Sequence, residues 1–138
     1  MKTVKLSFLA DQLEEAFEDW SQFYNVETGE VESIPNQDNA YADFEEFEEI
    51  ADKIEASDDY LRLPDQYEIH EYEIMEAFAE EKESKRLLRA LQGRGAFRRF
   101  KDCCIDLGLD EEYYAFRHEA LKQIAKEWCE DNDIPFEP

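Results

Sequence analysis

The sequence predicts an α+β fold, with an N-terminal helix and a small antiparallel hairpin or three-stranded sheet before a helical C-terminal half. Apolar residues recur at helical spacing in several segments, and an early aromatic-rich stretch is interrupted by a glycine turn. The 138 residues are the usual size of one domain. Ten Phe, seven Tyr and two Trp supply enough apolar area for a core despite the high charge. We therefore expect one domain over residues 1–138, with a mobile acidic tail at 130–138.

The first elements are a helix and a hairpin. An apolar stripe predicts a helix from Ser7 to about Asp19, with Ser7 as its N-cap. Two strands are expected at residues 20–26 and 31–34, because they flank a turn in which Gly29 can adopt positive φ. A polar connection at residues 36–40 follows the hairpin.

A strongly amphipathic helix is predicted next, from Tyr41 to about Ala56. Its apolar residues share one face and its acids share another. Residues 60–63, before Pro64, are expected to form a short strand that joins the hairpin, because three strands are stable where two are marginal.

The C-terminal half predicts only helices. They are expected at residues 66–80, from a Ser84 cap to Gly93, at 94–107 and, after an Asp110 cap, at 111–129.

Charge is distributed very unevenly along the chain. The 37 acids and 15 bases give a net charge of -22, yet residues 82–101 hold eight bases and one acid, a net of +7. Neutralisation of this basic segment by acidic helices of the same chain is the favoured interpretation. An anion-binding surface and head-to-tail self-association through opposite patches are the alternatives.

The sequence also indicates the cellular compartment in which we expect the protein. Its apolar runs are too short to span a membrane, and its N-terminus lacks the pattern of a secretory signal. Three cysteines, two of them adjacent, do not form a disulfide framework. We therefore expect a cytoplasmic protein.

The segment Gly93-Arg94-Gly95-Ala96-Phe97-Arg98-Arg99-Phe100-Lys101-Asp102 contains the main candidate site. On a helix, Phe97 and Phe100 fall on an apolar arc, and the bases fall on the remainder. A helix start beside glycines exposes N–H groups next to cations, which suits an anion or a partner. The candidate residues are Arg94, Gly95, Arg98, Arg99 and Lys101. The competing interpretation, which we favour, is a corner between two helices.

Arg117 is a second candidate because it falls within the apolar arc of the last predicted helix. A charged group there must pair with a carboxylate, stack on aromatic rings or face a cavity. It is therefore either an anion anchor in a pocket or, the interpretation we favour, a structural ion pair.

The sequence predicts no metal and no cofactor. His70 and His118 lack zinc-site spacing, and Cys103-Cys104 lacks the two-residue spacing of zinc or redox pairs. Because Phe97 and Phe100 project to the core arc and the net charge repels a polyanion, a nucleic-acid partner is not expected.

The GRGAFRRFKD segment resembles the signature of a family of small bacterial proteins, an uncharacterised family numbered 158 in its series. Similar residues are Tyr113-Tyr114-Ala115-Phe116-Arg117, Ala125-Lys126-Glu127-Trp128 and the turn Glu27-Thr28-Gly29-Glu30-Val31. The resemblance runs from the first helix to Asn132, and Cys103-Cys104 departs from it. It implies a bacterial, cytoplasmic, α+β protein and supplies no substrate.

Three hypotheses for function follow. The first is a non-enzymatic interaction or regulatory protein, whose basic segment 82–101 binds an acidic partner or a phosphate-bearing ligand. The second is an enzyme that holds a small anionic substrate with Arg117 and Arg94. The third is an acidic mimic of nucleic acid, suggested by the acids of residues 43–59.

Overall fold

A computed structural model describes residues 1–16, 19–36 and 44–138. The chain divides into two compact units, which are described separately below. The first contains residues 1–69 and 122–138, and the second contains residues 70–121. The expectation of one domain over the whole chain stays a prediction.

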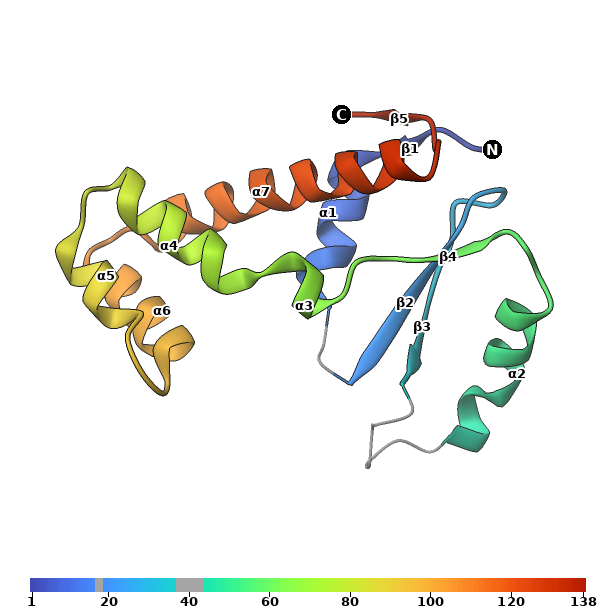
Figure 1. Ribbon diagram of the computed structural model, residues 1–138, viewed down its shortest axis with the longest axis horizontal. Helices are drawn as coiled ribbons and strands as arrows, with labels where there is room; N and C mark the ends of the chain where they lie inside the picture. Colours follow the sequence, from blue (N-terminus) through green and yellow to red (C-terminus); the bar gives the residue numbers. More distant parts are fainter. Residues whose placement is uncertain (17–18, 37–43) are drawn as a thin grey trace. The chain divides into compact units, whose positions relative to one another are not determined.

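The first unit contains a three-stranded antiparallel sheet, which confirms the predicted hairpin and its third strand. The strands are β2 (Trp20–Asn25), β3 (Val31–Pro35) and β4 (Tyr60–Arg62), in the order β3-β2-β4 (Figure 1). The Asn25 side chain closes the hairpin turn by accepting hydrogen bonds from the amides of Glu27 (2.9 Å) and Thr28 (3.0 Å). Gly29 supplies the positive φ of 77° that the turn requires.

A second, very short sheet joins segments from the two ends of the sequence. Strands β1 (Val4–Lys5) and β5 (Phe136–Glu137) pair in parallel, side by side in Figure 1. Val4 of β1 and Ile134, two residues before β5, are buried. Residues 136–137 of this segment are thus paired with the N-terminal strand. The expectation of a mobile acidic tail at 130–138 stays a prediction.

Helices of the first unit differ from prediction mainly at their ends. Helix α1 (Leu6–Glu14) begins one residue before the expected Ser7 cap, and Lys5 occupies the N-cap without a side-chain hydrogen bond. Burial of Leu6 explains the earlier start, because it draws this residue into the first turn. The predicted continuation to about Asp19 is wrong, because α1 ends at Glu14 with Glu15 as its C-cap. Residues 17 and 18 lie outside the described residues.

Helix α2 (Phe44–Glu55) is amphipathic, as expected, but none of its residues is buried. It packs mainly against β3, and its Phe47 ring meets the ring of Trp20, the first residue of β2, edge-to-face at 5.3 Å. The predicted start at residues 41–43 lies outside the described residues, as does most of the expected connection 36–40. The first unit is completed by α3 (Gln66–Ile69) and the C-terminal part of α7 (Asp110–Asp131).

The second unit is entirely helical among its described residues. It contains α4 (Glu71–Glu81), α5 (Lys85–Ala90), α6 (Ala96–Asp106) and the N-terminal part of α7. The prediction of one helix over residues 66–80 is wrong, because His70 adopts a left-handed φ of 55° and separates α3 from α4. The Ser84 cap is confirmed, since its hydroxyl accepts a hydrogen bond from the Leu87 amide at 3.1 Å.

An aromatic cluster forms the centre of the second unit. Phe78 lies at its middle, with ring centroids 5.4 Å from Tyr113, 5.4 Å from Phe116 and 6.5 Å from Phe100. Cys103 and Cys104 are buried in the same core. Helix α6 therefore has one face fixed in this core, and its other face carries the candidate site.

Candidate basic interface

Two glycines form the corner that begins α6. Gly93 and Gly95 have φ of 80° and 73°, and Gly95 is the N-cap of α6. A Cβ at Gly93 would meet no atom within 4 Å. Glycine is therefore favoured at this position because of its positive φ, and not because a larger side chain would clash with its neighbours. The predicted helix start at Arg94 is thereby moved to Ala96.

Arg99 holds this corner closed. Its Nε donates to the Ala90 carbonyl oxygen at 2.9 Å, and one terminal nitrogen donates to the Arg94 carbonyl oxygen at 2.8 Å. The other terminal nitrogen donates to the carbonyl oxygen of Gln92. These carbonyl groups belong to the end of α5 and the loop beyond it, where helix carbonyls lack helical partners. The guanidinium of Arg99 is thus occupied by its own backbone.

Three other candidates have different surroundings. Arg94, Arg98 and Lys101 are exposed. Within the described part of the chain their side chains form no ion pair and no hydrogen bond. We call these three residues the basic face.

The rest of the basic segment 82–101 is partly neutralised inside its own unit. Lys82 pairs with Glu112, and Arg86 pairs with Asp106 at 3.3 Å. The basic face is not included in these pairs, so the expected self-neutralisation, as far as the described residues show it, covers only part of the segment.

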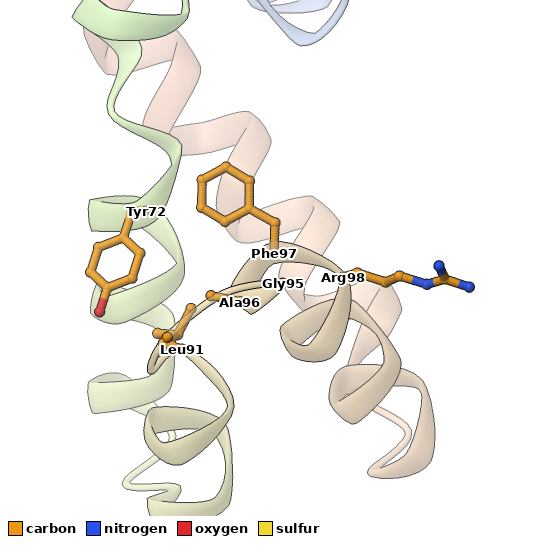
Figure 2. Close-up of a pocket in the computed structure, with 7 residues that line it drawn as sticks. Tyr72, Leu91, Gly95, Ala96, Phe97 and Arg98 are labelled. Atoms are coloured by element: carbon orange, nitrogen blue, oxygen red, sulfur yellow. The ribbon is translucent and has the colours of Figure 1, made fainter.

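An open hollow of about 670 Å³ adjoins the corner (Figure 2). Its wall combines the side chains of Tyr72, Leu91 and Phe97 with the backbone of the corner. Phe97 is 48% exposed, so the expectation that it packs in the core with Phe100 is wrong. Figure 2 also shows that the Arg98 side chain points away from Tyr72. We call this feature the aromatic hollow.

Arg117 is held by a carboxylate of its own unit. Its Nε donates to Glu71 Oε1 at 2.8 Å, and the Tyr113 hydroxyl donates to the same oxygen at 2.9 Å. Burial, followed by the charge of Glu71, raises the pKa of Tyr113 far above its usual value. The phenol therefore remains a donor at neutral pH. The structure places neither Arg117 nor Arg94 among the described residues that line the aromatic hollow.

The cysteines are in an environment that suppresses thiolate chemistry. All three are free and buried. Burial, with a smaller contribution from Cys103, raises the pKa of Cys104 to about 11, and burial together with Glu130 raises that of Cys129 to about 11. These two thiols are therefore protonated at neutral pH and poor nucleophiles.

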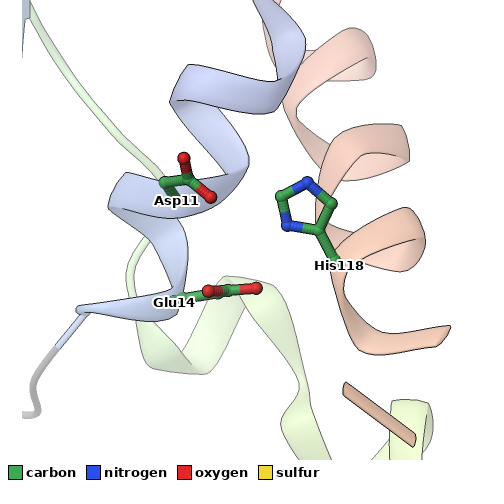
Figure 3. Close-up of side chains that lie close together, drawn as sticks. All are labelled: Asp11, Glu14 and His118. Carbon is green, nitrogen blue, oxygen red and sulfur yellow. The ribbon is translucent and has the colours of Figure 1, made fainter. Parts of the chain in front are cut away.

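The histidines are not assigned to a metal site. His70 lies at the break before α4. His118 is on α7, and Asp11 and Glu14 are exposed residues of α1 (Figure 3). Asp11 and Glu14 belong to the first unit and His118 to the second, so neither unit by itself contains all three of these side chains.

Comparison with known proteins gives one match. A family model described as "Uncharacterised protein family (UPF0158)" matches residues 37–137, a range that includes the corner, the basic face and Arg117. No match was found among curated proteins, and none among solved structures. None of the helices among the described residues has the length and apolar character needed to cross a membrane.

Proposed function

The chain belongs to UPF0158, an uncharacterised protein family, and from this premise we propose that it is a non-enzymatic binding protein. The proposed surface is the basic face, and the proposed partner is an acidic segment of another protein. The expected cytoplasmic location is part of this proposal and is supported by three free cysteines.

The observation that carries the proposal is that the cations of the basic face have no ion pair among the described residues and lie on the same corner and helix as an exposed aromatic side chain. Tyr72 is 40% exposed and Phe97 is 48% exposed. Large exposed apolar groups next to charges are typical of protein-binding surfaces, where aromatic anchors supply affinity and charges supply orientation. A partner segment with carboxylates around one or two apolar side chains would match both features.

The distribution of charge between the units favours the same surface. The second unit has nine bases and twelve acids, a net of -3, whereas the first unit has six bases and 25 acids, a net of -19. An acidic partner is therefore repelled least by the second unit. The net charge of -22 repels nucleic acid more strongly than a short acidic segment, because every nucleotide carries a phosphate charge.

The enzyme hypothesis gains less support from the geometry. Its two anchors, Arg94 and Arg117, do not line the aromatic hollow, and Arg117 already has Glu71 as a partner. The mimicry hypothesis rests on the acids of residues 43–59. Most of them lie on α2 and the segment after it, and residue 43 lies outside the described residues.

Site-specific photo-crosslinking would test the proposal. A photoreactive phenylalanine analogue at Phe97 in the full chain should form one dominant protein adduct in native cells. Arg98→Glu should abolish this adduct because it reverses a charge of the basic face. Lys126→Glu is the matched control, since Lys126 is exposed, carries the same charge and lies outside the basic face.

The outcomes separate the alternatives. Loss of the adduct with Arg98→Glu, but not with Lys126→Glu, would support the proposal when the captured protein contributes an acidic segment. Equal crosslinking in both variants would contradict it. Adducts that disappear after nuclease treatment would favour nucleic acid, and competition by inorganic phosphate alone would favour a phosphate-bearing ligand.

A further inference from the structure

Helix α2 of the first unit is amphipathic, yet its apolar side is only partly covered by its own unit. None of the residues Phe44–Glu55 is buried, and the Phe44 side chain at the start of the helix is 48% exposed. The packing of Phe47 on Trp20 holds the helix against the sheet but leaves the Phe44 ring half in solvent. An exposed aromatic ring of this kind can anchor a contact with another molecule.

Carboxylates follow this ring along the helix. Helix α2 has one base and six exposed acids, which are Glu45, Glu46, Glu48, Glu49, Asp52 and Glu55. Glu48 lies four positions after Phe44 and therefore on the same side of the helix, one turn further on. The one base, Lys53, pairs with Glu32 at 3.7 Å. The start of α2 thus presents an exposed aromatic ring beside a strongly negative surface.

The corner of the second unit has the complementary features. The aromatic hollow has a volume of about 670 Å³, and Tyr72 and Phe97 stand in its wall (Figure 2). The cations of the basic face have no ion pair among the described residues. A partner for this corner needs carboxylates around one or two apolar side chains, and the start of α2 has both.

We propose that the partner protein of the basic face is a second copy of this chain, and that the start of its α2 is the segment that binds. Phe44 of one copy enters the aromatic hollow of the next, and the carboxylates of Glu46 and Glu48 face the cations of the basic face. Because two different surfaces meet, the copies join head to tail. This inference rests on the proposed function and deepens it by naming the partner.

Salt screening allows two chains with a net charge of -22 to associate. At about 0.15 M ionic strength the Debye length is about 8 Å, so exposed charges further apart than this interact only weakly. The facing groups of the contact are closer than this and attract each other. We therefore expect the association to be strongest near this ionic strength. It should weaken in low salt, where whole chains repel each other, and in high salt, where the facing charges are screened.

Sedimentation velocity of the full chain at pH 7 and physiological ionic strength is the test. The weight-average sedimentation coefficient of the wild type should rise from micromolar to sub-millimolar concentration. Arg98→Glu and Phe44→Ser should each raise the dissociation constant about tenfold or more, because they remove a cation and the aromatic anchor. Lys126→Glu and Tyr67→Ser make the same changes at exposed positions outside the contact, and should leave the association unchanged.

A mixture of the two defective variants tests the head-to-tail arrangement. Arg98→Glu retains α2 and Phe44→Ser retains the basic face, so an equimolar mixture should associate at concentrations where neither variant does alone. A sedimentation coefficient of the wild type that does not depend on concentration, or a mixture that stays monomeric, would overturn the inference.

Photo-crosslinking from position 97 separates this inference from the proposed function. An adduct with α2 of a second copy supports both. An adduct with a different acidic protein that depends on Arg98, formed by a chain that stays monomeric, overturns the inference and leaves the proposed function standing. The absence of any adduct that depends on Arg98 contradicts both.

Discussion

Arg98 and Arg99 are identical neighbours whose surroundings differ. The guanidinium of Arg99 donates hydrogen bonds to the carbonyl oxygens of Ala90, Gln92 and Arg94. The Arg98 side chain is exposed and has no partner among the described residues. The pair therefore separates the two interpretations of the GRGAFRRF segment. Arg99 maintains the corner, and Arg98 belongs to the surface that the corner presents.

Substitution of the two arginines should have unequal effects on stability. Arg99→Gln is expected to lower the free energy of unfolding by about 1–3 kcal/mol, because carbonyl groups of the corner lose their donors. Arg98→Gln should change it by less than about 0.5 kcal/mol. Urea denaturation followed by circular dichroism measures both. Equal losses would contradict the role of Arg99.

Glu71 provides a comparable test in the polar network with Tyr113 and Arg117. Glu71→Ala removes the acceptor of both groups and is expected to cost about 1–3 kcal/mol, since the ion pair is partly exposed. Glu73→Ala, at an exposed position on the same first turn of α4, is the control and should be nearly neutral. Thermal unfolding of both variants gives the comparison, and a neutral Glu71→Ala would show that the network is unimportant.

Helical periodicity predicts which face of a helix is apolar, but neither the burial of a residue at a helix end nor a partner distant in the sequence. Helical spacing placed Phe100 in the core correctly, because its ring packs against Phe78 of α4 and Tyr113 of α7. The same spacing placed Phe97 there, but its position in the first turn at the corner leaves it exposed. The Glu71 partner of Arg117 is 46 positions away, and nothing in the local sequence around Arg117 indicates it.

At the scale of elements, strongly patterned segments were predictable and breaks were not. The hairpin, the third strand and the helical second half followed from apolar spacing and turn residues. The break between α3 and α4 did not, because a single histidine is only a weak signal of left-handed backbone, which few histidines adopt. The pairing of β1 with β5 was also missed, since two-residue strands have no periodicity.

The strained backbone at His70 predicts a stabilising substitution. His70→Gly should raise the free energy of unfolding by about 0.5–1 kcal/mol, because glycine adopts a φ of 55° without the steric cost of a Cβ. His118→Gly is the opposite control and should destabilise, since His118 lies inside α7. Chemical denaturation distinguishes them. Destabilisation by His70→Gly would show that the histidine side chain itself stabilises this junction.

For the whole molecule, buried groups that must stay protonated are expected to limit folding stability at alkaline pH. Cys104 is in the second unit and Cys129 in the first, and both have a pKa of about 11 against an ordinary 9.0. The unfolded chain loses these protons first, so the contribution of the two thiols to stability should be fully present below about pH 9 and should be lost as the pH rises toward 11. The raised pKa values of Tyr24 and Tyr113 add to this fall above pH 10.

Alanine substitution at both thiols tests this dependence. Cys104→Ala/Cys129→Ala should unfold more easily at pH 7 because it leaves small cavities, yet lose less stability between pH 9 and pH 11 than the wild type. A two-unit shift corresponds to about 2.7 kcal/mol for each thiol at most. The measurement is denaturant unfolding at several pH values, and identical pH slopes would contradict the role of the thiols.

The pairing of β1 with β5 has a consequence for the order in which the chain can fold. The second unit is one continuous stretch, so its contacts close short loops. Val4 must instead find Phe136, a partner 132 positions later in the sequence, which carries a larger entropic cost of loop closure. During synthesis the residues of the second unit are complete while those of the first still wait for their last strand. A released chain truncated before residue 134 should thus already protect amides of α4–α6 from hydrogen exchange, and leave those of β1 unprotected.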